Sequence, residues 1–102
     1  MIRVTFCEQD GSLTGFRLSG HSGFAAAGSD IVCAAATSSA LMAANTVTEI
    51  IGDKADISVS EGVMELEVPS PSEKTKAVLS GLKLHLSELS KQYGARLQIT
   101  EV

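Results

Sequence analysis

Aromatic side chains are scarce in this chain of 102 residues. Tryptophan is absent, and Phe and Tyr bring the aromatic share to only 4%, against a hydrophobic share of 44%. The core of a single domain of this length must therefore be built mainly from Ala, Val, Ile and Leu, which bury less area per residue than aromatic rings. Such a domain gains stability from a partner subunit.

Clusters of basic residues are also missing. The eight Lys and Arg residues are scattered along the chain, the formal net charge is −4 and the isoelectric point is about 5.0. Proteins that bind nucleic acid directly carry a basic patch or stripe that neutralises phosphates. We therefore expect no direct contact with nucleic acid.

Cysteine and histidine are rare as well. Cys7, His21, Cys33 and His85 match no common spacing of metal ligands, and the two cysteines form no CxxC pair. We expect neither a metal nor another cofactor. The first residues lack the basic start and the longer apolar stretch of a secretion signal, so we expect a cytoplasmic protein with reduced thiols.

The longest uncharged stretch covers residues 31–48, about the length of a membrane span. It contains several hydroxyl and amide side chains, which a lipid-facing helix avoids: Thr37, Ser38, Ser39, Asn45, Thr46 and Thr48. We therefore expect a helix buried in protein, with no membrane. Ser29 or Asp30 would cap this helix, which ends near Ile51 before Gly52. A helix that is small or apolar nearly all round is typical of a central, buried position.

Alternating apolar and polar residues predict two hairpins, one turning at Asp10–Gly11 and one at Glu61–Gly62. Ser70–Glu73 reads as a capping box that begins a second helix at residue 71, and Gly94 ends that helix. The expected elements are strands at 2–6, 16–19, 57–60, 64–68 and 97–99, with helices at about 30–51 and 71–93. We expect an α+β domain over residues 1–102, of order ββαββαβ, with one mostly antiparallel sheet and two helices packed on it.

Cys33 is the candidate nucleophile. If Asp30 caps the helix, Cys33 lies in the first helical turn, where unpaired N–H groups and the helix dipole stabilise a thiolate. A thiol stabilised in this way is nucleophilic near neutral pH. The alternative is that Cys33 is a packing residue in an Ala-rich helix and that Asp30 is only a cap.

His21 is the candidate base. It follows Gly20 at a strand-to-loop junction, and if the glycine-rich segment 20–28 folds back, the imidazole and the thiol can meet as a Cys–His pair. The alternative is a solvated His21. Thr37 follows Cys33 by one helical turn, so its hydroxyl could reach the sulfur or bond back to the Cys33 carbonyl.

The other thiol and imidazole show no such features. Cys7 lies on the first strand with neither a cap nor a nearby His, so we interpret it as structural. His85 falls on the flank of the second helix's apolar stripe, where we expect it to be half solvated.

The segment 20–37 resembles the ribosomal-processing cysteine protease family, Prp. The signature of that family reads approximately G-H-x-G, a short variable loop, and then G-x-D-I-V-C-A-A. Gly20–Gly23 and Gly28–Ala35 reproduce both parts in order and at the right separation. Thr37 departs from the pattern, because the family has Ser at this position; the hydroxyl is kept.

The resemblance implies a homodimeric cysteine endopeptidase with a catalytic dyad of Cys33 and His21, supported by Gly20, Asp30 and Thr37. It also implies a substrate, the precursor of a large-subunit ribosomal protein, whose short N-terminal extension is removed after a pair of aromatic residues. An apolar channel would receive that tail, and Phe24, Leu41 and Met42 are the candidate lining residues.

Two other hypotheses remain open at this point. The chain could be a non-catalytic ribosome-assembly module that binds the same tail without cutting it. It could also be a redox-sensing thiol protein, which would require Cys7 to lie close to Cys33 in space.

Overall fold

The computed structural model describes residues 1–20 and 27–101. The elements are β1 (Ile2–Gln9), β2 (Ser12–Ser19), α1 (Ala27–Asn45), a π-helical turn η1 (Thr46–Ile51), β3 (Asp56–Ser60), β4 (Val63–Glu67), α2 (Glu73–Tyr93), a short 3-10 turn η2 (Gly94–Arg96) and β5 (Leu97–Glu101). The predicted ββαββαβ order is confirmed.

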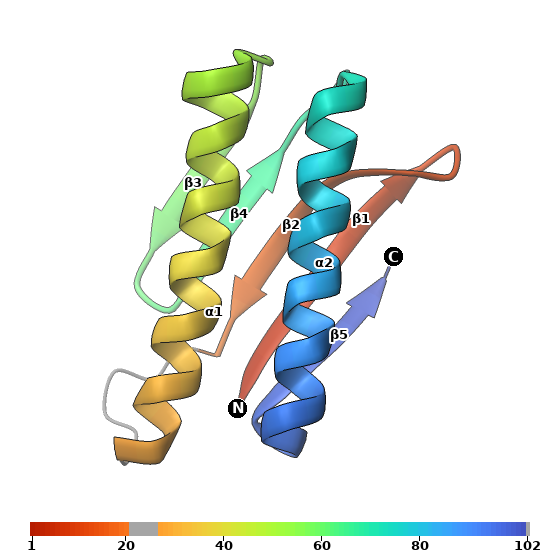
Figure 1. Cartoon of the computed structure of the whole chain (residues 1–102). Helices are drawn as coiled ribbons and strands as arrows, with labels where there is room; N and C mark the ends of the chain where they lie inside the picture. Colours follow the sequence, from red (N-terminus) through yellow and green to blue (C-terminus); the bar gives the residue numbers. More distant parts are fainter. Residues whose placement is uncertain (21–26, 102) are drawn as a thin grey trace.

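The five strands form one sheet with the order β3-β4-β2-β1-β5. The pairs β1–β2, β2–β4 and β3–β4 are antiparallel, whereas β1–β5 is parallel, so the sheet is mixed and mostly antiparallel, as predicted. Figure 1 shows α1 and α2 side by side on one face of this sheet. The arrangement is a two-layer α+β fold.

The core lies between the helices and the sheet. Ile2, Val4 and Phe6 of β1 alternate with more exposed residues and point into it, because successive side chains of a strand face opposite sides of a sheet. Phe6 and Phe16 contact each other with ring centroids 6.3 Å apart. The remaining buried residues are chiefly Ala, Val and Leu, as the scarcity of aromatics predicted.

β2 and β4 approach each other closely at Gly15. A Cβ added to Gly15 would overlap the carbonyl oxygen of Leu66 on β4, and Gly15 is itself buried. Only glycine allows these two strands to pair at this spacing.

α1 differs from its prediction at its N-terminus. The helix begins at Ala27, so neither Ser29 nor Asp30 is its cap, and the expected capping residue is wrong. Alanine is the strongest helix former, which allows the helix to extend into the segment whose glycines suggested a loop. The C-terminal end is as predicted: η1 ends at Ile51, and Gly52 follows with φ 84° and donates its N–H to the Val47 carbonyl at 2.9 Å.

α1 is also not a central helix. Its sheet-facing side, which includes Val32, Ala36 and Ala40, is fully buried, but its outward side is exposed, and Met42 is 64% exposed. Residues 31–51 form a helix long and apolar enough to cross a membrane by length and composition, and 39% of the most apolar window is buried in the protein. Burial is therefore one-sided, because the helix packs on one face of the sheet.

The N-terminus of α2 is tied to the end of η1 by one carboxylate. Asp53 Oδ2 accepts hydrogen bonds from the Ser72 N–H (2.8 Å), the Ser72 hydroxyl (2.8 Å) and the Thr75 hydroxyl (2.6 Å). Ser72 in turn caps the helix by accepting from the Thr75 N–H at 3.3 Å. The helix therefore begins at Glu73, two residues after the predicted start.

These bonds make the stability of the protein sensitive to acid. They lower the pKa of Asp53, with the Thr75 hydroxyl as the largest cause, because they stabilise the charged carboxylate. The stabilisation is complete above the ordinary pKa of 3.8 and is lost as the pH falls through the lower pKa of the folded state. We expect Asp53→Asn to lower the melting temperature at pH 7, with the difference from wild type shrinking below pH 4. A constant difference from pH 7 to pH 3 in melting curves would contradict this.

Candidate active site

Cys33 lies on the side of α1 that faces the sheet. It is 8% exposed, and its Sγ is 4.0 Å from the hydroxyl oxygen of Thr37, one helical turn further along. The expectation that the Thr37 hydroxyl reaches the sulfur is thus supported by the geometry. The contact is long enough that it orients the thiol weakly.

Cys33 is further from the helix start than the sequence suggested. Because α1 begins at Ala27, Asp30 falls in its first turn and Cys33 in its second. The effect of a helix dipole on a charge falls off within the first turn. The predicted first-turn placement is therefore wrong, and the helix dipole acts on Cys33 more weakly than it would on a residue of the first turn.

Gly20 lies between the end of β2 at Ser19 and the candidate base. Its φ is 92°, a conformation that L side chains rarely adopt, and a Cβ there would overlap the carbonyl oxygen of Met1. Glycine is therefore required at this position, both for its φ and for its close approach to Met1. His21 and Phe24 lie outside the described residues, so their roles stay predictions.

Leu41 and Met42, the other predicted lining residues, lie on different sides of α1. Leu41 continues the i+4 series of Cys33 and Thr37, whereas Met42 is about 100° further round the helix. Both are exposed. Leu41 is therefore on the side of the thiol, and Met42 is on the side of α2.

A small cavity adjoins Thr37, whose hydroxyl lies beside the Cys33 thiol. It has a volume of about 110 Å³ and lies between α1 and the β3–β4 hairpin, lined by Leu18, Thr37, Val59, Ser60, Gly62, Val63 and Met64. Only Thr37 among these was singled out from the sequence. The sequence pattern identifies the other lining residues only as parts of strands and a turn, because strand alternation does not indicate which end of a strand lies beside a given helix residue.

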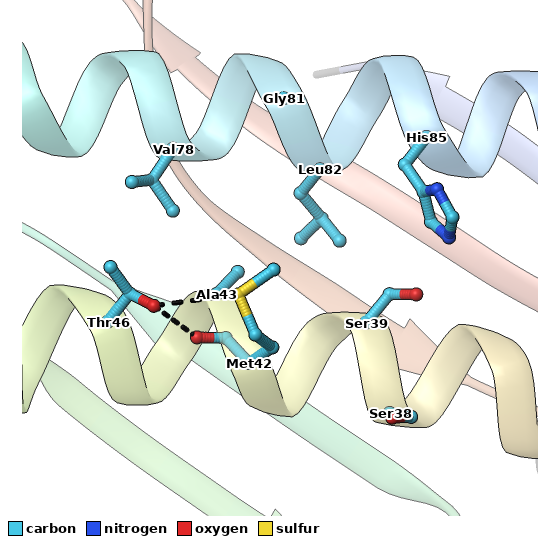
Figure 2. A pocket seen from close by; sticks show the side chains of 9 residues that line it. All are labelled: Ser38, Ser39, Met42, Ala43, Thr46, Val78, Gly81, Leu82 and His85. Atoms are coloured by element: carbon cyan, nitrogen blue, oxygen red, sulfur yellow. Dashed lines mark hydrogen bonds between the residues drawn. The ribbon is translucent and has the colours of Figure 1, made fainter.

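A larger groove of about 550 Å³ runs between the two helices. Figure 2 shows Val78, Leu82 and His85 of α2 pointing towards α1 across it, opposite Met42 and Thr46. The Thr46 hydroxyl donates to the Met42 carbonyl at 2.7 Å, so it is already used within its own helix. Neither Cys33 nor Thr37 lines this groove, which places it apart from the candidate nucleophile.

Cys7 is separated from Cys33 by the sheet. It follows the buried Phe6 on β1 and so points to the opposite face, where Glu65 and Glu67 lie. Partial burial raises the pKa of the Cys7 thiol, and the two glutamates raise it further. The redox hypothesis required these two thiols to be close in space, and the structure contradicts that condition.

No cluster of three or more His, Cys, Asp and Glu residues that could hold a metal occurs within residues 1–20 and 27–101. His85 is exposed on α2. The candidate site therefore consists, in the described part of the chain, of the Cys33 thiol, the Thr37 hydroxyl and the small cavity beside them.

Comparison with known proteins places this geometry among peptidases. A family model described as "Cysteine protease Prp" matches residues 1–98. The ribosomal processing cysteine protease Prp of Bacillus subtilis (strain 168) is 29% identical over 108 aligned positions, which cover 98% of this chain and 96% of that protein.

Solved structures show the same fold. The essential ribosomal processing protease Prp from S. aureus, crystallised with a substrate peptide, superposes with a TM-score of 0.91 at 20% identity, and all of both chains is covered. The SMU.848 protein from Streptococcus mutans gives a TM-score of 0.88 at 23% identity, covering 100% of this chain and 96% of that one.

Proposed function

The chain belongs to the cysteine protease Prp family and is a peptidase, and from that premise we propose that it removes the short N-terminal extension of a large-subunit ribosomal protein precursor with a Cys33–His21 dyad. The observation that carries the proposal is the position of Cys33. Its thiol lies beside the Thr37 hydroxyl, which in turn borders an open apolar cavity. The name of the B. subtilis relative supports the ribosomal substrate.

The chemistry needs one nucleophile and one base. The His21 imidazole accepts the thiol proton of Cys33, and the thiolate forms a C–S bond to the substrate carbonyl carbon. When the tetrahedral intermediate collapses, the C–N bond breaks and the imidazolium gives its proton to the leaving amine. Water, deprotonated by the imidazole, then hydrolyses the thioester and restores the thiol.

The roles of the supporting residues are inferred from their positions in the fold. We propose that Gly20, whose positive φ and close contact with Met1 only glycine allows, supports the position of the adjacent His21. We propose that Thr37 orients the thiol and that Asp30 supports the dyad from the first turn of α1. Phe24 and Leu41 are proposed to contact the substrate, whereas Met42 lies on another side of α1 and is proposed below as a dimer contact instead.

The test is direct. The purified protein is incubated with a peptide that carries the N-terminal extension of its own host's ribosomal precursor, and the products are weighed by mass spectrometry. We expect one cut at the end of the extension. An intact peptide after long incubation with reduced enzyme, while the peptide binds, would favour the non-catalytic assembly module.

Thiol reactivity separates these two functions independently. A catalytic Cys33 paired with an imidazole reacts with iodoacetamide at neutral pH, whereas an ordinary thiol with a pKa near ~8.5 reacts slowly there. Labelling is followed by peptide mapping between pH 5 and pH 10. The neutral-pH reactivity of Cys33 should disappear in His21→Ala if the dyad exists.

We also propose a cytoplasmic homodimer that needs no cofactor, formed through the outward sides of α1 and α2. Ile31, Met42 and Leu84 are large apolar residues exposed on this layer, and no helix or strand of residues 1–20 and 27–101 covers its outer side. Because exposed apolar surface can mark an interaction site, these three residues are the basis of the dimer proposal.

We expect Met42→Asp to raise the dimer dissociation constant about 30-fold or more, the effect typical of a central interface residue, because it places a charge in an apolar contact. Ile57→Asp, on the far edge strand β3, is the control and should leave the dimer intact. Sedimentation velocity measures both. A monomeric wild type, or a dimer that tolerates Met42→Asp, would contradict this surface.

A further inference from the structure

We propose that the cavity bounded by α1, β2 and the β3–β4 hairpin receives one apolar side chain of the substrate next to the scissile bond, and that Val59 determines the largest side chain accepted. This inference rests on the proposed peptidase function of Cys33. It adds a specificity-determining residue on a strand that carries none of the predicted site residues.

The link between cavity and thiol is Thr37. Its hydroxyl oxygen is 4.0 Å from Cys33 Sγ, and the same residue lines the cavity. A peptide whose carbonyl carbon is within bonding reach of the sulfur therefore has its nearest side chains within a few ångströms of the cavity mouth. The larger groove between the helices lacks this connection, because neither Cys33 nor Thr37 borders it.

The chemistry of the lining selects an apolar side chain. Leu18 and Met64 are buried residues of the core, and Val59 and Val63 add aliphatic walls. Within the part of the chain that the structure describes, the lining includes hydroxyls from Thr37 and Ser60 but no charged side chain. An ionised substrate side chain would lose its hydration here without gaining a partner, which disfavours it strongly.

The size of the cavity limits the occupant. Its volume is about 110 Å³, and an apolar protein cavity of ~150 Å³ holds one benzene molecule. A branched aliphatic side chain therefore fits, and a single aromatic ring fits if part of it stays at the open mouth. A two-ring indole exceeds the space.

Val59 is the lining residue that can be substituted without destabilising the fold. It is 66% exposed on β3, an edge strand, so it contributes little to the core. Ile57 lies two residues earlier on the same face of the same strand and is also exposed, but it does not line the cavity. The two positions form a matched pair in which only one touches the proposed subsite.

The experiment compares Val59→Trp with Ile57→Trp on a peptide series that places Ala, Leu, Phe or Trp at each position flanking the cut. Filling the cavity should lower kcat/KM for the Leu and Phe peptides by about 10–200-fold at one flanking position, the usual range for a lost apolar contact. The Ala peptide should lose much less, and Ile57→Trp should match wild type throughout. Val59→Ala should do the reverse and increase cleavage of the Trp peptide relative to Leu.

Two controls separate this inference from the proposed function. Iodoacetamide labelling of Cys33 should be equal in wild type and Val59→Trp, which shows that the dyad is undisturbed. If wild type cuts no peptide, the proposed function fails. The affinity of Cys33→Ala for the Leu and Ala peptides, measured with and without Val59→Trp, still shows whether the cavity binds an apolar side chain. Equal effects of the two tryptophan variants, or no loss of discrimination in Val59→Trp, would overturn the inference.

Discussion

Cys33→Ala should leave no measurable peptide cleavage, a loss of at least about 10⁴-fold, the scale seen when the nucleophile of a covalent peptidase is removed. The physical reason is that no other group in the described chain can form the acyl-enzyme at this place. The Thr37 hydroxyl is 4.0 Å from the sulfur, but an aliphatic hydroxyl is a far weaker acid than a thiol and cannot replace it as nucleophile. Cleavage is measured by mass spectrometry over the longest practical incubation.

The chain offers a matched control for this substitution. Cys7→Ala removes the other thiol, which faces the opposite side of the sheet and whose pKa is raised by burial, Glu67 and Glu65. We expect Cys7→Ala to cut at the wild-type rate. Cys33→Ala should keep the fold as well, because alanine suits a helix interior already rich in alanine. Equal activity of Cys33→Ala and wild type would remove the basis of the whole assignment.

Gly15→Ala should cost at least about 1–3 kcal/mol of the free energy of unfolding, the range for overpacking a core. The added Cβ would overlap the Leu66 carbonyl oxygen, which belongs to the backbone and cannot rotate away. The strands β2 and β4 must then separate, and both belong to the central part of the sheet. Chemical denaturation followed by circular dichroism measures the loss.

Gly81→Ala is the matched control for this prediction. Gly81 lies in the middle of α2, and a Cβ added there meets no atom within 4 Å. Because glycine destabilises a helix interior by about 1 kcal/mol relative to alanine, Gly81→Ala should stabilise the protein. The same chemical change is thus expected to act in opposite directions at the two sites, and a loss of stability at both would contradict the steric explanation.

Strand periodicity and turn residues predicted most of the fold. The hairpins at Asp10–Gly11 and Glu61–Gly62 and the α+β layering follow from local patterns, since each pattern reports which side of an element is buried. What the sequence could not show is how the hairpins join. The β2–β4 contact depends on the missing side chain of Gly15, and nothing local distinguishes this glycine from one in a turn.

The helix boundaries show where local rules compete. Serine and aspartate at 29 and 30 read as caps, but alanine at 27 favours helix as strongly, and the structure extends the helix to it. At α2 the reverse happens: Ser72 rather than Ser70 is the cap, because Asp53, distant in sequence, binds the Ser72 N–H and hydroxyl. A tertiary contact of this kind leaves no mark in the local sequence.

One part of the candidate site could also be predicted from local sequence, and another part could not. Cys33 and its relation to Thr37 could be predicted, because they are on one helix at i+4 spacing. The cavity residues Val59, Val63 and Met64 could not, since they reach the thiol's side of α1 only through the order of strands in the sheet.

The parallel pairing of β5 with β1 joins two segments that lie far apart in the sequence. Leu97 of β5 is fully buried, and the Thr5 and Thr100 hydroxyls are hydrogen-bonded at 3.2 Å across 95 positions of sequence. During synthesis the edge of β1 that pairs with β5 therefore stays without its partner strand until residues 97–101 have emerged from the ribosome. A nascent chain that stalls before that point has every residue of the candidate site but lacks one strand of the sheet beneath it, so the fold that supports the site is complete only after β5 has been made.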